Sequence, residues 1–73
     1  MTTTYDYAKL LGRIREKRLT QSELARKIKI SETSLNLSLN NKRPFKQSEI
    51  SKICDVLLIS NDNLESYFFA KTL

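Results

Sequence analysis

The sequence predicts an all-α domain of five short helices. Gly and Pro each occur once among the 73 residues, whereas a β fold with many tight turns would need more of both. Apolar residues recur at three- and four-residue spacings along most of the chain, which is the period of a helix face packed on a core. A chain of this length can form one domain with a modest core. We therefore expect residues 1–73 to form a single helical domain.

The N-terminal part is expected to hold one helix. Residues 1–4 are expected to fray, and the helix is expected over Tyr5–Lys17. Its inward face is marked by apolar residues at the spacing i, i+3, i+4 and i+7, namely Tyr7, Leu10, Leu11 and Ile14. Gly12 lies inside this helix at a cost of about 1 kcal/mol relative to alanine, and a close approach of another helix would explain it.

Two short helices separated by a tight turn are expected at about residues 20–40. Thr20 and Glu23 form a capping box, and Ser31 can cap the second helix, so each helix has its own start signal. Helices this short are not stable alone in water, so the two are expected to pack as a pair. They are expected over Gln21–Ile28 and Glu32–Asn40, with inward residues Leu24, Ala25, Ile28, Leu35 and Leu39, and with Ile30 in the turn.

The C-terminal part is expected to hold two further helices. A basic loop at Asn41–Phe45 contains the single proline, Pro44. The fourth helix is expected over Gln47–Leu57, and the fifth over Asn61–Phe69 with Ser60 as its cap. The inward residues expected from helical spacing are Ile50, Ile53, Cys54 and Leu57 in the fourth helix, and Leu64, Tyr67 and Phe68 in the fifth.

The outer face of the helix expected at residues 32–40 has the chemistry of a base-reading surface. With Leu35 and Leu39 inward, a rotation of about 100° per residue leaves small polar side chains and one leucine outside. These are Thr33, Asn36, Leu37 and Asn40, with Ser34 at the edge. Asn and Thr can hydrogen-bond base edges, and an aliphatic side chain can pack on a thymine methyl. A merely solvated face would carry Lys and Glu, but here only Glu32 is charged, which favours recognition.

Positive charge coincides with this helix pair. The chain carries 13 basic and 8 acidic residues, a net charge of +5. From Lys9 to Lys46 there are eleven basic and three acidic residues, a balance of +8, whereas the balance from Gln47 to the C-terminus is −2. Such asymmetry is expected of a protein that binds nucleic acid with one end and does something else with the other.

The composition argues against an enzyme, a metal site and a membrane protein. There is no histidine, and Cys54 is the only cysteine, so neither a disulfide framework nor a zinc site is expected. Cys54 is expected to be a small core residue in a protein of the reducing cytoplasm. The longest apolar run, Val56–Ile59, is too short for a membrane span or a secretory signal. We expect no cofactor and no small-molecule substrate.

These residues resemble a known family. Placing Gln21 first in the twenty-position helix-turn-helix pattern puts apolar side chains at Leu24, Ile28, Ile30 and Leu35, and the small Ala25 at the helix crossing. Over Tyr7–Phe68 the chain resembles the five-helix λ-repressor-like helix-turn-helix domain, especially the small Cro-type repressors of temperate bacteriophages. The segments GRIREK and LNNKRPF are similar to Cro-like or modulator-of-repression proteins from phages of Gram-positive hosts.

Two residues depart from the family pattern. Lys29 stands where the turn usually has glycine. That position often takes a positive φ, which costs a residue with a Cβ about 1 kcal/mol. Ser38 stands where a large apolar residue is usual, and Leu39 is expected to replace it through a rotated or extended third helix.

The resemblance implies two sets of DNA contacts, and the exposed apolar residues suggest a set of protein contacts that shares Leu37 with them. The implied base-reading residues are Glu32, Thr33, Ser34, Asn36 and Leu37. The implied phosphate contacts, which position a protein on DNA without specifying sequence, are Thr20, Gln21, Asn40, Asn41, Lys42, Arg43 and Lys46. The candidates for a protein interface are Leu37, Tyr67 and Phe69.

Two functions follow from the resemblance. The first is a Cro-like transcription regulator that binds double-stranded operator DNA and opposes the lysogenic repressor in the lysis/lysogeny switch. The alternative is an antirepressor or modulator that binds the phage repressor protein and masks its DNA-binding face, and an antitoxin of the same fold is a third interpretation. Either regulator is expected in the cytoplasm of the bacterial host cell. The oligomeric state stays open, a homodimer included.

Overall fold

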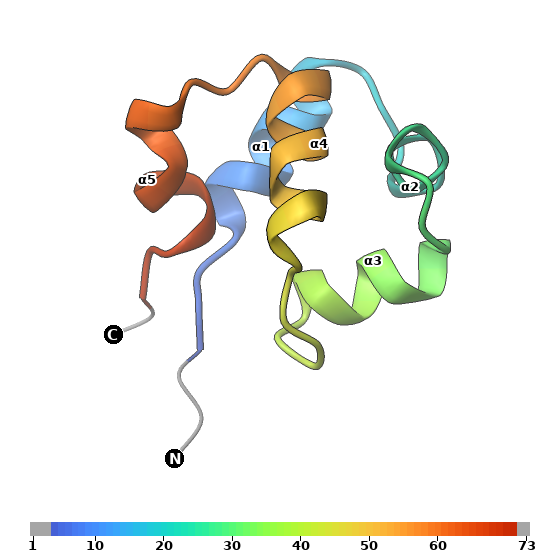
Figure 1. The fold of residues 1–73 in the computed structure, drawn as a ribbon, viewed down its shortest axis with the longest axis horizontal. Helices are drawn as coiled ribbons and strands as arrows, with labels where there is room; N and C mark the ends of the chain where they lie inside the picture. Colours follow the sequence, from blue (N-terminus) through green and yellow to red (C-terminus); the bar gives the residue numbers. More distant parts are fainter. Residues whose placement is uncertain (1–3, 72–73) are drawn as a thin grey trace.

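The computed structural model describes residues 4–71, and within them the fold is all-α, as predicted (Figure 1). Its elements are α1 (Ala8–Glu16), α2 (Gln21–Ile28), α3 (Glu32–Leu39), α4 (Gln47–Leu57), a 3-10 turn η1 (Asn61–Asn63) and α5 (Leu64–Phe68). In Figure 1, α4 runs through the middle, with α2 and α3 on one side and α5 on the other. No helix among the described residues is long and apolar enough to cross a membrane.

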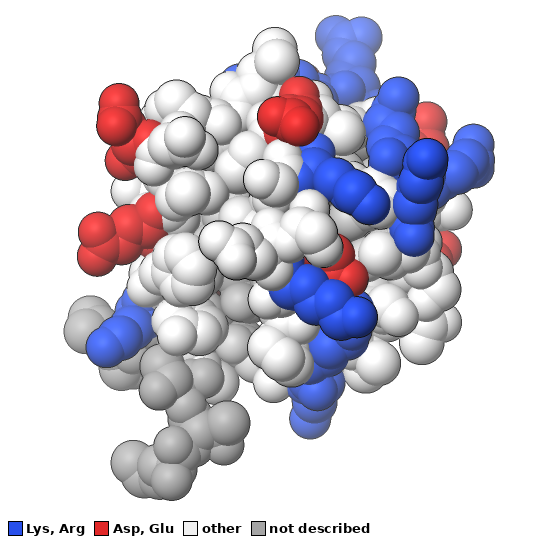
Figure 2. Space-filling model, viewed as in Figure 1, with Lys and Arg blue, Asp and Glu red and all other residues white. Residues whose placement is uncertain are grey.

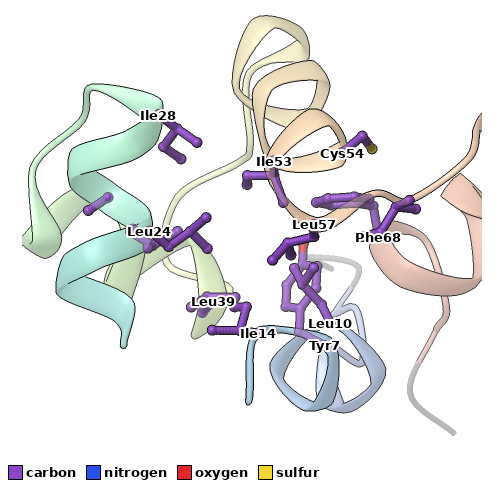
Figure 3. Close-up of a cluster of buried hydrophobic side chains, with 13 residues drawn as sticks. Tyr7, Leu10, Ile14, Leu24, Ile28, Leu39, Ile53, Cys54, Leu57 and Phe68 are labelled. Carbon is purple, nitrogen blue, oxygen red and sulfur yellow. The ribbon is translucent and has the colours of Figure 1, made fainter. Parts of the chain in front are cut away.

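A single hydrophobic core holds the helices together (Figure 3). Side chains from α1, α2, α4 and α5 converge on it, and α3 adds Leu35 and Leu39. Most expected inward residues are buried, whereas five are only partly buried at its edge: Leu11, Ile30, Ile50, Leu64 and Tyr67. The buried core residues are Tyr7, Leu10, Ile14, Leu24, Ala25, Ile28, Leu35, Leu39, Ile53, Cys54, Leu57, Ile59 and Phe68.

The first helix begins at Ala8 rather than at Tyr5. A tertiary contact holds the preceding segment away from the helix: the Tyr5 N–H donates to Asn41 Oδ1, and Asn41 Nδ2 donates to the Tyr5 carbonyl, both at 2.9 Å. Tyr5 also forms an isolated antiparallel bridge with Lys71. Of the stretch 1–4 expected to fray, residues 1–3 lie outside the described residues, and Thr4 is exposed.

The start signals of the two central helices are confirmed. The Glu23 N–H donates to Thr20 Oγ1 at 3.1 Å, and the Thr20 N–H donates to Glu23 Oε1 at 3.0 Å. These hydrogen bonds hold the pKa of Glu23 below the usual range of a glutamate. The Ser34 N–H donates to Ser31 Oγ at 3.0 Å, which caps α3. Both caps satisfy backbone donors that have no partner within the helix.

The expected fifth helix is split into η1 and α5. Residues 61–63 read Asn-Asp-Asn, and such side chains compete with the helix for backbone hydrogen bonds, so the first turn tightens to 3-10. Ser60 has the extended backbone of an N-cap but makes no side-chain cap bond to the helix. Its Oγ instead accepts from Asn63 Nδ2 at 3.2 Å.

Each of the four longer helices is followed by a residue with a left-handed backbone, and none of these residues is glycine. In each case the next N–H donates to a carbonyl five residues back, the bond of a Schellman motif. Lys29, with φ 63°, confirms the positive φ expected in the α2–α3 turn. The four positions are Arg18, Lys29, Asn41 and Leu58, and the donors are the N–H groups of Leu19, Ile30, Lys42 and Ile59.

Three further expectations differ from the structure. A Cβ added at Gly12 would meet nothing within 4 Å, so no close helix approach requires this glycine. Leu39 does not replace Ser38, because both are buried along with Leu35. These three residues keep the i, i+3, i+4 spacing of an ordinary inward face, so α3 needs no rotation. Likewise α3 ends at Leu39, and Asn40 is its C-cap.

The single glycine therefore lies inside a helix, where it lowers stability, and not at any of the four left-handed positions, where it would raise stability. Gly12→Ala should raise the free energy of unfolding by about 0.5–1 kcal/mol, because alanine has the better helix propensity and the site is open. Lys29→Gly should add a few tenths to about 1 kcal/mol by relieving the left-handed backbone. Urea melts of both single variants and the double variant would test this. A clear loss of stability in either single variant would contradict the backbone argument.

Candidate functional site

The five base-reading candidates all lie on α3, on the side away from the core. Four of them are exposed, and Ser34 is half-buried with its Oγ 2.9 Å from Ser31 Oγ. Leu37 is the apolar member of this surface and is 40% exposed. The helix buries only Leu35, Ser38 and Leu39. The remaining side chains of α3 are therefore open to a partner, as the sequence predicted: Glu32, Thr33, Asn36 and Leu37.

A row of carboxamides joins the start of α2 to the end of α3. Asn36 Nδ2 donates to Gln21 Oε1 at 3.3 Å. Asn40 Nδ2 donates to the Asn36 carbonyl at 2.8 Å and lies 3.3 Å from Asn36 Oδ1. A carboxamide carries two donors and an acceptor with two lone pairs, so each group retains unused capacity. The row can therefore present oriented hydrogen-bonding groups to a base edge or to a protein backbone.

The phosphate candidates fall into three groups. Lys42 and Lys46 are exposed in the loop between α3 and α4, and both can reach a partner. Thr20, Gln21 and Asn40 lie at helix ends beside the α3 surface, where their polar atoms take part in the bonds already described. The remaining two, Asn41 and Arg43, direct their side chains to other parts of the protein.

Arg43 belongs to a partly buried network that the sequence did not reveal. Its Nη2 lies 2.7 Å from Glu49 Oε2, and its Nη1 donates to Glu49 Oε1 at 3.0 Å and to Ser38 Oγ at 2.8 Å. The Lys46 N–H also donates to Glu49 Oε1, at 3.0 Å. Glu49 is only 5% exposed, and the guanidinium holds the pKa of that carboxyl below its usual range even though burial opposes this.

The network links α3, the loop and α4, and it leaves no polar side-chain atom buried without a partner among the described residues. It also explains Ser38, whose hydroxyl occupies an inward position because Arg43 supplies a donor. Two signals in the sequence could have suggested it. One is a serine in a position of the inward face, and the other is a glutamate at the third position of α4, where it can reach back to the preceding backbone.

Charge is segregated on the surface (Figure 2). Basic side chains gather over α2 and the loop after α3, whereas acidic side chains project at α5. The exposed residues concerned are Arg26, Lys27, Lys29, Lys42 and Lys46 on the basic side, and Asp62 and Glu65 on the acidic side. The asymmetry counted along the sequence is therefore also an asymmetry in space.

The three protein-interface candidates do not form one patch. Leu37 is on α3, whereas Phe69 follows α5 and is 44% exposed. Tyr67 is half-buried, with Lys9 Nζ 5.1 Å from the centre of its ring. Of the two aromatic candidates, Phe69 is therefore the exposed one. Cys54 is buried as expected, and burial raises the pKa of its thiol, which disfavours the reactive thiolate.

Comparisons with known proteins identify a family and a solved structure that this chain resembles. A family model described as "Protein of unknown function (DUF739)" matches residues 3–71. The solution structure of the modulator of repression of the temperate bacteriophage TP901-1 from Lactococcus lactis is 42% identical in sequence, with a TM-score of 0.76. The match covers 89% of this chain and 88% of that chain. A search of curated proteins finds no match. The matched protein is, by its name, a regulatory modulator.

The Arg43–Glu49 pair should make stability depend on pH. Glu49→Gln should lower the free energy of unfolding at pH 7 by about 1–3 kcal/mol, because it weakens hydrogen bonds to a charged group. Since folding lowers the pKa of Glu49, its contribution is full above about pH 4.3, the ordinary glutamate value. The contribution is lost as pH falls through the lower folded-state pKa.

Urea melts of parent and variant at pH 7, 5 and 3 would test this prediction. The difference between the two proteins should shrink at the lowest pH. Glu65→Gln, which changes an exposed carboxylate, is the matched control and should have little effect. A Glu49→Gln variant as stable as the parent at pH 7 would show that the pair contributes nothing to folding.

Proposed function

We propose that this chain, which belongs to the DUF739 family, is a bacteriophage regulator that modulates repression by binding the phage repressor protein and masking its DNA-binding face. The observation that carries the proposal is the 42% identity to the TP901-1 modulator of repression across nearly the whole of both chains. It favours a partner protein over the Cro-like role, because the matched protein is itself a modulator of repression.

The α2–turn–α3 unit is, in this proposal, the helix-turn-helix of a single λ-repressor-like domain formed by residues 1–73. Two eight-residue helices flank a turn at residues 29–31, and α2 packs on both α3 and α4. The left-handed backbone at Lys29 supports this assignment, because the turn of that motif often uses a positive φ at this point. The motif would place α3 as an outward-facing recognition helix.

The surface of α3 suits a protein partner. Leu37 provides an apolar centre, and Thr33, Asn36 and Asn40 around it are exposed polar side chains. Protein interfaces commonly place apolar anchors at the centre and hydrogen-bonding groups at the rim. In the complex, Leu37 would be buried against the repressor while the carboxamides would bond to polar groups at the edge of the contact.

Leu37 is the residue to change. Leu37→Asp should abolish binding of the cognate phage repressor, because it would bury an unpaired charge in the interface. Leu37→Ala should weaken that complex less severely. Leu58→Asn is the matched control, since Leu58 is an exposed leucine with a left-handed backbone that asparagine tolerates. Calorimetric titration of each variant with the repressor would measure the affinities. Repressor binding unaffected by Leu37→Asp would exclude α3 as the contact surface.

A second candidate function is Cro-like binding of operator DNA. The observation that favours it is the cluster of exposed cations beside α3, with a balance of +8 over Lys9–Lys46. In this case Leu37 would contact at most one thymine methyl. Leu37→Ala would then cost no more than about 1–3 kcal/mol of DNA affinity, confined to one base pair.

Salt dependence tests the DNA function. Binding to any duplex should weaken steeply as salt rises, because phosphate contacts release counterions. Lys42→Glu combined with Lys46→Glu should weaken binding to all sequences about equally and should reduce the salt slope by about 1 per lost contact. These two lysines are chosen because changing Arg43 would also break its pair with Glu49. Fluorescence anisotropy with DNA from beside the gene, and with a scrambled duplex, would measure this. No binding at about 50 mM salt would exclude the DNA function.

A further inference from the structure

A second surface, separate from the outer face of α3, has the properties of a docking site. It is a groove of about 440 Å³ between the N-terminal segment, the α3–α4 loop and α5. We call it the aromatic groove, after the rings that line it: Tyr5, Tyr7, Phe45, Phe68 and Phe69. A space of this size can accept one or two large apolar side chains, since it falls within the range of ordinary ligand pockets.

The side chains that line the aromatic groove are held in place by contacts within the free protein. Tyr5 packs edge-on against Phe69 at 5.9 Å between ring centres, and Phe45 packs edge-on against Phe68 at 5.6 Å. The backbone of Tyr5 is fixed on both sides by the carboxamide of Asn41. A preorganised apolar site loses less conformational freedom on binding than a mobile one, so these contacts favour binding.

The α3 surface alone is too small for a stable complex. An eight-residue helix is about 12 Å long and about 10 Å wide, whereas a standard interface buries about 800 Å² on each partner. A repressor bound to α3 must therefore also contact a neighbouring surface. The aromatic groove adjoins α3, because the Lys42 N–H donates to the Leu37 carbonyl at 2.8 Å and Lys42 also lines the groove.

Charge complementarity indicates which of the surfaces next to α3 the repressor also contacts. A DNA-binding face is itself basic, because it neutralises phosphates. The α2 side of α3 carries the exposed cations Arg26, Lys27 and Lys29, which would repel the basic DNA-binding face of the repressor. On the other side, Phe69 borders both the aromatic groove and a shallow hollow lined by Asp62, Glu65 and Lys71, which together carry a net charge of −1. Lys42 and Arg43 also line the groove, at its α3 end, but Arg43 is paired with Glu49. The apolar site therefore has negative charge beside it.

We propose that the aromatic groove is the second anchor of the repressor complex. A large apolar side chain from the repressor's DNA-binding face is seated against Phe69 and Tyr5, and a neighbouring Lys or Arg faces Asp62 and Glu65. The interface then runs from Leu37 across the α3–α4 loop to α5. This inference rests on the proposed function, but it names a surface and a partner chemistry that the function alone does not specify.

Two variants test the proposal by titration with the cognate phage repressor. Phe69→Ser should weaken the complex about tenfold or more, because central aromatic anchors carry much of the binding energy. Glu65→Lys should weaken it severalfold, and that effect should shrink as salt rises. Leu58→Asn is again the matched control, since Leu58 is 71% exposed and does not line the groove. It should bind like the parent.

The outcomes separate the two proposals. Urea melts establish whether each variant is folded. If Phe69→Ser does not fold, Glu65→Lys still tests the groove, because Glu65 lies at an exposed site where the substitution should not disturb folding. Loss of repressor binding with Leu37→Asp but not with Phe69→Ser or Glu65→Lys would exclude the aromatic groove from the interface. The proposed function would not be contradicted by that result. A parent protein that does not bind the repressor would overturn the function itself. If Phe69→Ser changed only self-association in sedimentation experiments, the groove would belong to a second copy of this chain, and the proposal would be wrong.

Discussion

The arrangement of both candidate surfaces depends on the ion pair between Arg43 and Glu49. This pair, with the Ser38 hydroxyl, joins the end of α3 to the start of α4 across a loop that Asn41 and Phe45 also anchor, through Tyr5 and Phe68 respectively. A carboxylate this deeply buried is costly without a partner, so the loop conformation and the ion pair require each other. With the loop fixed, Asn41 reaches Tyr5, and one wall of the aromatic groove is set.

This small domain has two surfaces that differ in charge and in shape. The basic side over α2 and the α3–α4 loop suits an anion such as DNA, whereas the region around α5 combines an apolar groove with acidic side chains (Figure 2). Binding DNA and binding a DNA-binding protein require opposite charges on the contact surface. A protein with both can make either contact, and the two contacts would share only residues of α3 and of the α3–α4 loop.

The turns show how tertiary packing overrides local preference. The four left-handed positions after α1 to α4 are filled by Arg, Lys, Asn and Leu, while the only glycine lies inside α1. The residue after three of these positions is apolar and packs on the core, namely Leu19, Ile30 and Ile59. Burial of that residue, together with the Schellman hydrogen bond, offsets a backbone cost of about 1 kcal/mol.

The sequence by itself determined what depends on neighbours along the chain. The number of helices, the caps at Thr20 and Ser31 and the exposure of Leu37 follow from periodicity and from contacts within about four residues. The left-handed backbone of Lys29 was expected from the family pattern of the turn. Only the tertiary structure decided the rest. The late start of α1 depends on a pair of hydrogen bonds between residues 36 apart in sequence, and the aromatic groove gathers rings from both ends and the middle of the chain. Such contacts leave no periodic pattern, because they form only after the core has brought distant segments together.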